Sequence, residues 1–224
     1  MAQTPVGAAN ERFQIALGGR TWLVEREGNL DALWEKLGQE DFGEDERIPY
    51  WTEVWPASLG LGRFLAENRG RLEGRACLDM GCGLGLTVLA GTAMGASVTG
   101  LDYEPEALRF ARRNAALNNV EPAGWVLTDW RRPGLKERSF EVVWGSDVMY
   151  EKRFIAPVVS FLDHVLAAGG AAWLAEPGRS LYKDFVAHAR DTGWSCEKAA
   201  HYDVRPPYSE RIRVGVGIWE LRRA

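Results

Sequence analysis

The segment CLDMGCGLG at residues 77–85 constrains the fold of this chain more than any other feature. Its apolar first half predicts a short buried strand, and its glycines predict a sharp turn into the helix that follows. One helix length later, the segment VTGLD at residues 98–102 predicts a second strand that ends in a carboxylate. This arrangement is typical of a nucleotide-type cofactor site in a doubly wound α/β fold.

The position of the first acid indicates the charge of the cofactor. Asp79 stands two residues before the first glycine, where a carboxylate would repel a diphosphate and attract a cation. Position 86, where a dinucleotide fingerprint requires a small residue, holds leucine. S-adenosylmethionine suits this turn because it carries an ammonium, a sulfonium and no phosphate, and Asp102 can accept hydrogen bonds from both ribose hydroxyls. The expected cofactor contacts in this region are Asp79, Gly81, Cys82, Gly83 and Asp102; the alternative is a plain strand-helix turn that binds nothing.

Composition argues against several other classes of function. With 224 residues, of which 46% are hydrophobic, the chain is long enough for one well-buried α/β domain and short for two. A formal net charge of −4 provides no basic face for a nucleic acid. The three cysteines lack metal-ligand spacing and the three histidines lie far apart, so we expect no metal site. Without a secretory pattern or a long apolar run, we expect a cytoplasmic protein with no membrane partner.

Apolar periodicity and turn residues divide the chain into alternating strands and helices. Residues 13–24 predict a β-hairpin, residues 30–37 a short helix and residues 40–47 an exposed acidic loop. Strands are predicted at 76–80, 97–101, 124–128, 140–144 and 171–175, helices at 58–68, 84–94, 105–117, 154–166 and 181–192, and two antiparallel strands at 194–202 and 212–221. We therefore expect one domain, with a hairpin and cap at residues 1–57 and, at residues 58–224, a Rossmann-like α/β core whose mostly parallel sheet is covered by helices on both faces.

Several motifs together resemble those of a known family. They are PYW at 49–51, VWP at 54–56, LDMGCG at 78–83, TDW at 128–130, DVMY at 147–150 and EPGR at 176–179. The chain resembles the seven-β-strand S-adenosylmethionine-dependent methyltransferases. Within them it is most similar to the methyltransferase-like protein lysine methyltransferases, in the branch that acts on the β subunit of electron-transfer flavoprotein. The resemblance covers about residue 13 to the end and implies the methyltransferase variant of the doubly wound fold, with a C-terminal antiparallel hairpin.

The resemblance implies further cofactor contacts at the ends of the strands. Asp129 would accept a hydrogen bond from the exocyclic amine of adenine, and Trp130 would pack on the adenine ring. Trp55, from the segment before the core, would close over the cofactor, and Ser146 follows the fourth strand of the predicted core. Ordinary packing is the alternative for Trp130, and anchoring of the N-terminal cap is the alternative for Trp55.

The predicted catalytic residues are Asp147, Tyr150 and Glu176. Asp147 would orient an acceptor amine and take its proton, while Tyr150 would line a partly dry channel that favours the neutral amine. Glu176 and Arg179 would hold the acceptor or bind the Asp147 loop. The alternatives are a helix cap at Asp147, packing at Tyr150 and a plain turn after Glu176. The branch that this chain resembles usually has aspartate at position 176. The extra methylene of glutamate would shift the carboxylate by about 1.5 Å, so the identity of the substrate stays open.

The resemblance implies methyl transfer from S-adenosylmethionine to a lysine side chain of a protein. A small-molecule N- or O-methyltransferase and a non-catalytic S-adenosylmethionine-binding module are the alternatives. An acidic rim from residues 40–46 would suit a protein acceptor. Pro206 and Pro207 are expected to shape the loop between the last two strands, which could border the acceptor entrance.

Overall fold

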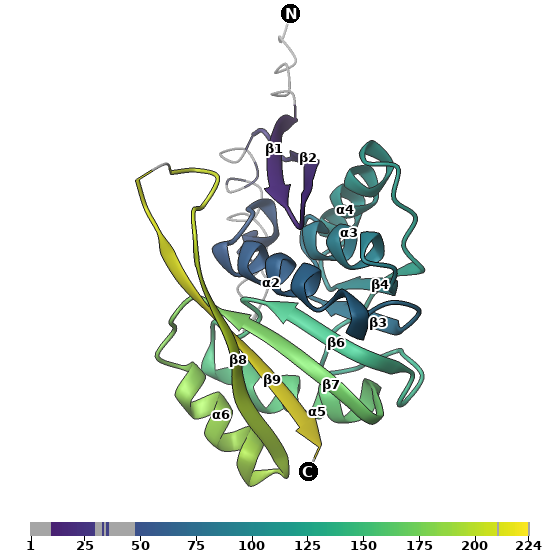
Figure 1. The fold of residues 1–224 in the computed structure, drawn as a ribbon, viewed down its shortest axis with the longest axis vertical. Helices are drawn as coiled ribbons and strands as arrows, with labels where there is room; N and C mark the ends of the chain where they lie inside the picture. The colour runs from purple at the N-terminus through teal and green to yellow at the C-terminus, as the bar shows by residue number, and fades with distance from the viewer. Residues whose placement is uncertain (1–9, 30–32, 34, 36–47, 210, 224) are drawn as a thin grey trace, which may run out of the picture.

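The computed structural model describes residues 10–29, 33, 35, 48–209 and 211–223. These residues form a large sheet flanked by helices and a separate two-stranded sheet near the N-terminus (Figure 1). The predicted helix at 30–37 and the acidic stretch at 40–47 lie outside the described residues, apart from Leu33 and Glu35.

The seven-stranded sheet has the order β5-β4-β3-β6-β7-β9-β8. Strands β3 to β7 pair in parallel, whereas β9 is antiparallel to both β7 and β8. The order reverses between β3 and β6, and ligands bind at the carboxyl ends of the strands at such a switch point. The strands are β3 (Ala76–Met80), β4 (Ser97–Asp102), β5 (Gly124–Leu127), β6 (Phe140–Ser146), β7 (Leu166–Glu176), β8 (Trp194–Val204) and β9 (Val214–Arg223).

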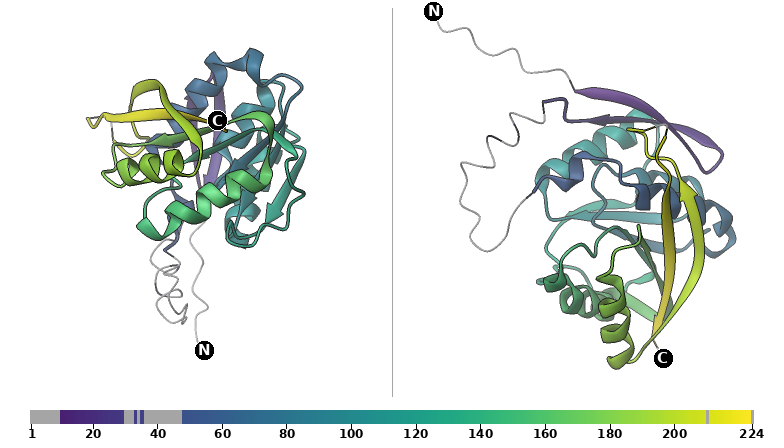
Figure 2. Two further views of the ribbon diagram at one scale, coloured as in Figure 1. Left: turned by 90° about the horizontal axis from the view of Figure 1, so that it is seen from below. Right: turned by 90° about the vertical axis from the view of Figure 1, so that its left-hand side faces the viewer.

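Helices cover both faces of this sheet (Figures 1 and 2). One apolar core lies beneath α2 (Pro56–Glu67), α3 (Leu86–Ala93) and α4 (Pro105–Leu117), and a second lies beneath α5 (Ile155–Val165) and α6 (Tyr182–Asp191). Short 3-10 turns are η1 (Tyr50–Thr52), η2 (Arg69–Arg71) and η3 (Lys152–Phe154). The two-layered covering explains why the central strands are apolar along their whole length.

Helix α2 joins the N-terminal hairpin to the sheet. Pro56 occupies its first turn, where a missing N–H costs nothing. Gly60 lets Val216 of β9 approach so closely that a Cβ would lie 2.6 Å from its side chain, and Gly62 gives similar room to Leu17. The hairpin strands are β1 (Glu11–Leu17) and β2 (Arg20–Arg26), as the alternation predicted.

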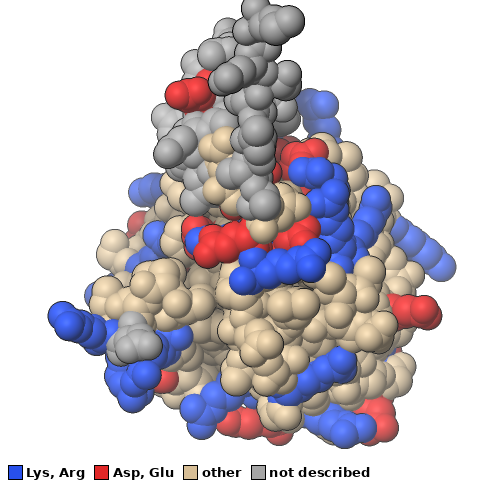
Figure 3. Space-filling view, turned by 90° about the horizontal axis from the view of Figure 1, so that it is seen from above, with Lys and Arg blue, Asp and Glu red and all other residues tan. Residues whose placement is uncertain are grey.

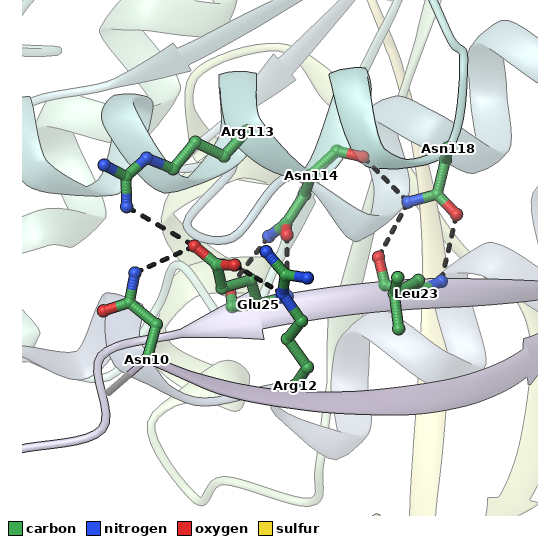
Figure 4. Close-up of polar contacts among 7 residues, drawn as sticks. All are labelled: Asn10, Arg12, Leu23, Glu25, Arg113, Asn114 and Asn118. Atoms are coloured by element: carbon green, nitrogen blue, oxygen red, sulfur yellow. Dashed lines mark hydrogen bonds and ion pairs between the residues drawn. The ribbon is translucent and has the colours of Figure 1, made fainter. Parts of the chain in front are cut away.

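Asn114 of α4 and Asn118, the C-cap residue of this helix, bind the backbone of β2 (Figure 4). Asn118 accepts from the Leu23 N–H at 2.9 Å and donates to its carbonyl at 2.7 Å. Asn114 makes the same pair with the backbone of Glu25, at 2.7 and 3.0 Å. Side chains four residues apart lie on one face of a helix, so both asparagines reach β2. They pair with the N–H and C=O groups of its backbone, as a neighbouring strand would.

The Glu25 carboxylate completes this contact. Burial alone would raise its pKa, but hydrogen bonds from Arg12 and Asn10 and the charge of Arg113 hold the pKa below its usual value. The hairpin is therefore docked by charged as well as backbone hydrogen bonds (Figure 4).

The observed fold confirms the expected doubly wound sheet with its C-terminal antiparallel hairpin and small N-terminal hairpin. The largest difference is the start of β7, which begins at Leu166 rather than near residue 171. Leu166 is already extended and pairs with Phe140 before a register shift. Among the described residues, no helix is long and apolar enough to cross a membrane.

Candidate cofactor and acceptor site

A cavity of about 110 Å³ opens at the carboxyl ends of β3, β4 and β6. The glycine turn after β3, the first residues after β4 and the loop after β6 form its walls. Residues 48–58, which lead into α2, supply the remaining wall with Tyr50, Trp51 and Trp55. The cavity thus lies at the switch point that the strand order creates.

The glycine turn has a conformation that side chains would obstruct. Gly81 and Gly83 have φ values of 74° and 51°, in the left-handed region. A Cβ at Gly81 would lie 3.1 Å from Val148 and 3.3 Å from Trp130. The N–H groups of Gly81 and Cys82 both donate to the carbonyl of Leu101, at 2.8 and 2.9 Å. The turn is therefore tied to β4 and leaves its glycine surface against the cavity.

Asp102 lies at the end of β4 and lines the cavity, as predicted for a ribose contact. Its carboxylate accepts from the N–H of Gly83 at 2.9 Å and of Glu104 at 3.0 Å. Burial raises its pKa, and these backbone donors oppose the rise. A carboxylate has room for further donors, so a vicinal diol can still be accepted.

Asp79 lies beneath the turn and does not line the cavity. It is fully buried and accepts a hydrogen bond from the Thr87 hydroxyl at 2.5 Å. Burial raises its pKa to about 7, although the Thr87 bond acts in the opposite direction. Asp79 therefore lies behind the lining and binds Thr87 of α3, and its contact with a cationic cofactor stays a prediction.

Trp130 stands between the main cavity and a small neighbouring one of about 40 Å³, and it lines both. Asp129 lines only the smaller cavity and binds the Arg131 guanidinium, with the shortest contact at 2.6 Å. Tyr103, which follows the acid of β4, lines both cavities. Sequence reasoning assigned no role to Tyr103, because nothing local distinguishes it from a surface tyrosine.

Asp147 lines the cavity after β6 and is held by Arg179, which follows β7. The guanidinium donates to both carboxylate oxygens of Asp147, at 2.6 and 2.7 Å. Asp147 has a φ of 54° and donates its N–H to the carbonyl of Ala175 at 2.9 Å. This bidentate pair raises the pKa of Arg179 further above its usual value. Of the two roles expected for Arg179, the geometry shows contact with the Asp147 loop.

Glu176 does not reach the cavity. Its Oε2 atom accepts from the N–H of Gly178 at 2.6 Å and of Arg179 at 3.0 Å, so the carboxylate closes its own turn. Glu176 thus holds the turn that carries Arg179, and a direct catalytic role for Glu176 stays a prediction.

Aromatic rings form the wall opposite the glycine turn. Tyr150 lies edge-on to Tyr50, with ring centroids 5.0 Å apart, and to Phe154 at 5.1 Å. The indole N–H of Trp55 donates to the carbonyl of Tyr50 at 2.7 Å, which fixes Trp55 at the start of α2. Burial raises the pKa of Tyr150, so its hydroxyl stays neutral. Ser146, at the end of β6, completes the lining near these rings.

The charged side chains that line the cavity are all acidic, and two of them have arginine partners outside the lining, Glu53 with Arg26 and Asp147 with Arg179. Its lining includes the carboxylates of Glu53, Asp102, Glu104 and Asp147, and none of the described lining residues is Lys, Arg or His. Such a cavity disfavours a phosphate and favours a cation. The residues therefore fit S-adenosylmethionine better than a dinucleotide. No group of three or more potential metal ligands occurs in the part of the chain that the structure describes.

Comparisons with known proteins agree with this fold. Residues 77–170 match the family model described as a methyltransferase domain. The chain is 31% identical over 138 residues to the electron transfer flavoprotein beta subunit lysine methyltransferase of Danio rerio, which covers 61% of this chain and 53% of that protein. It is 26% identical over 128 residues to a histidine protein methyltransferase 1 homolog of Dictyostelium discoideum, covering 55% of this chain and 41% of that protein.

A solved structure shows the same fold over nearly the whole chain. A 16S rRNA methyltransferase of T. thermophilus, in complex with AdoMet and guanosine, has a TM-score of 0.65 at 16% identity and covers 99% of this chain and 52% of that one. The chain spans about half the length of the curated relatives it matches. By its family match over residues 77–170 and its fold, the chain is similar to S-adenosylmethionine-dependent methyltransferases.

Proposed function

We propose that this protein binds S-adenosylmethionine and transfers its methyl group to a lysine side chain of a protein. The observation that carries the proposal is the cavity at the switch point, lined by a glycine turn and four carboxylates with no basic side chain among its described lining residues. S-adenosylmethionine, when bound, supplies a methyl group on a positively charged sulfur.

The cofactor would lie across the glycine turn. Asp102 would accept from the ribose hydroxyls, while Trp130 and Tyr103, which line both cavities, would enclose the adenine. Gly81, Cys82 and Gly83 would allow close approach of the backbone, with Ser146 and Trp55 bordering the cofactor. Asp129 would reach the adenine amine only if it shared its carboxylate with Arg131.

The acceptor would enter between Tyr50, Tyr150 and Asp147. These aromatic rings exclude water, and desolvation favours the neutral form of a lysine amine. Asp147, whose two oxygens are held by Arg179, would accept a hydrogen bond from the amine N–H and so aim the nitrogen lone pair at the methyl group. Proton release would follow through water or through Asp147.

The proposed acceptor is also supported by the relatives. The curated relatives above are named as methyltransferases of protein side chains, lysine in one and histidine in the other. Their identities of 26 to 31% support the chemistry class more strongly than the acceptor residue. We also infer a reducing compartment, the cytoplasm, because all three cysteines are free and buried.

Calorimetry tests cofactor binding. S-adenosylmethionine should bind the wild-type chain, NAD should not, and Asp102→Asn should weaken binding by about tenfold or more because a charged acceptor is lost. Glu121→Gln, on an exposed loop, is the matched control and should bind as wild type. Equal affinity for both cofactors would refute the proposed site.

A second experiment tests the acceptor. Cofactor labelled in its methyl group is incubated with the enzyme and a cell lysate, and labelled proteins are digested and sequenced by mass spectrometry. Methyllysine in protein bands is expected. Label found only in small molecules would favour a small-molecule methyltransferase, and binding without any transfer would favour a non-catalytic module.

A further inference from the structure

A groove of about 350 Å³ lies beside α2, outside the cofactor cavity. Its floor is apolar, formed by Ile15, Leu17, Leu59 and Val204. Its rim carries Gln14, Arg63, Arg205 and Pro207. The groove therefore joins three segments that are distant in sequence: the strand β1, the helix α2 and the end of β8.

The groove runs along the edge of β1. Residues 14–18 all line it in succession, whereas one face of a strand would present only every second side chain. Among the described strands, β1 pairs only with β2, so its other edge has backbone groups available for an added strand. An extended peptide can bind such an edge through its main chain.

The loop after β8 extends the rim of the groove. Arg205, Arg211 and Arg213 are all exposed, and none forms an ion pair with a described residue. On the same loop, Tyr208 and Ile212 are 58% and 50% exposed. Figure 3 shows basic side chains gathered at the left margin of this face, on the side where Figure 1 has the β8–β9 loop.

Two described acids lie beside this basic surface: Glu67, which pairs with Arg63 of the groove rim, and Asp203, two residues before Arg205. Glu67 binds Arg63 at 2.9 Å and the Tyr202 hydroxyl at 2.6 Å, and Asp203 lies 3.9 Å from His201. The chain as a whole has a net charge of −4, whereas this loop places three arginines within nine residues.

The groove adjoins the proposed catalytic site. Gly217 of β9 pairs with Glu176 at the carboxyl end of β7, so the loop that precedes β9 projects beyond the same edge of the sheet as the cavity. On α2, Ser58 lines the cavity and its neighbour Leu59 lines the groove. The groove and the cofactor cavity therefore both border the first turn of α2.

We propose that this groove and residues 205–209 and 211–213, together the docking surface, bind an extended acidic segment of the protein acceptor. The arginines attract its carboxylates, the edge of β1 pairs with its backbone, and the apolar floor with Tyr208 and Ile212 takes its apolar side chains. The identity of the occupant as the acceptor rests on the proposed function; the binding chemistry does not.

Fluorescence anisotropy tests the docking surface directly. The probe is a short labelled peptide that alternates glutamate with leucine and valine, and the comparison probe has lysine in place of glutamate. The acidic probe should bind and the basic one should not. Replacing Arg205, Arg211 and Arg213 with glutamate should weaken binding by about tenfold or more at low salt.

Matched variants separate charge from apolar contact. The same charge reversal at Arg69, Arg112 and Arg138, which are exposed elsewhere, should leave probe affinity unchanged. Replacing Tyr208 and Ile212 with serine should weaken binding by a similar factor at low and at high salt, because apolar contact is not screened. Binding of the probe that is unaffected by either loop variant would overturn the proposal.

Two further measurements make the outcome decisive. Calorimetry should give the loop variants the wild-type affinity for S-adenosylmethionine, while their rate of protein labelling in a lysate falls. If S-adenosylmethionine fails to bind the wild-type chain, the proposed function fails even where the probe binds. If vesicles of phosphatidylglycerol bind the docking surface and the acidic probe does not, the surface recognises a membrane and the proposal is wrong.

Discussion

Asp147 is the residue on which the proposed acceptor site most depends. A non-glycine residue with a φ of 54° is strained, and it persists only where neighbouring contacts hold it. Here the restraint comes from Arg179, which clamps both carboxylate oxygens, and from Ala175, which accepts the Asp147 N–H. Glu176 in turn fixes Arg179, so an unbroken chain of contacts runs from β7 to the cavity.

Removing Arg179 should therefore impair transfer more than binding. In Arg179→Ala we expect the rate of methyl transfer to fall by about 100-fold, since small displacements of an aligning group have effects of that order. The affinity for S-adenosylmethionine, measured by calorimetry, should remain that of the wild type. Arg179→Lys should recover only part of the rate, because lysine cannot bind both oxygens in one plane.

Glu176→Gln is the companion variant. Its amide oxygen can still accept from the two N–H groups, so its loss of rate should be smaller than that of Arg179→Ala. If Arg179→Ala lost cofactor affinity as much as rate, Arg179 would belong to the cofactor site instead. The rate of protein labelling and the calorimetric affinity together decide between these roles.

At the scale of elements, the contact between α4 and β2 attaches the N-terminal hairpin to the core. The sequence predicts a helix over 105–117, and Asn118 is its C-cap residue in the structure. Its second role, and that of Asn114, depends on β2, which lies about 90 residues away along the chain. No local pattern contains that information.

Asn114→Ala should destabilise the protein by about 1 to 3 kcal/mol, because it leaves the buried N–H and carbonyl of Glu25 unpaired. Urea denaturation measures the free energy of unfolding. Arg112→Ala, on the exposed side of the same helix, should change it by no more than about 0.5 kcal/mol. Equal stability of the two variants would show that the hydrogen bonds of Asn114 to Glu25 contribute little to the free energy of unfolding.

At the scale of the whole molecule, the buried acid at Asp79 couples stability to pH. Its pKa in the folded protein is about 7, against 3.8 for the free side chain, because burial disfavours the charged form. Between these pH values the folded protein retains a proton that the unfolded chain has lost. The contribution of Asp79 is therefore most favourable below pH 4 and declines as pH rises toward 7.

Asp79→Asn cannot ionise and should remove this decline. The difference in unfolding free energy between the variant and the wild type should shift in favour of the variant as pH rises from about 4 to about 7, and level off above. Urea denaturation at a series of pH values measures this difference. Acids such as Glu25, whose pKa is lowered, have the opposite effect on stability, but they affect both proteins equally and cancel in the difference. A difference that does not change with pH would contradict the raised pKa of Asp79.

Local patterns were sufficient for much of the fold and for part of the site. Apolar periodicity predicted β3 at residues 76–80 and placed β4, β5 and β6 within two residues of their observed bounds. The signal is clearest for β3 and β6, which are central strands covered on both faces. Because parallel strands carry their site residues at the carboxyl ends, Asp102, Ser146 and Asp147 could also be expected to converge. Asp79 and Glu176 also lie on these strands but do not line the cavity, because the direction of a side chain at a strand end depends on what packs around it.

By itself, then, the sequence determined the alternation of strands and helices, the glycine turn and the acid at the end of β4, because these follow from periodicity and backbone conformation over a few residues. Only the tertiary structure decided that Asp79 is buried beneath the turn, that Arg179 clamps Asp147 and that β1, α2 and the β8–β9 loop share a groove. Each of these depends on contacts between distant segments, whose partners are chosen when the whole chain packs.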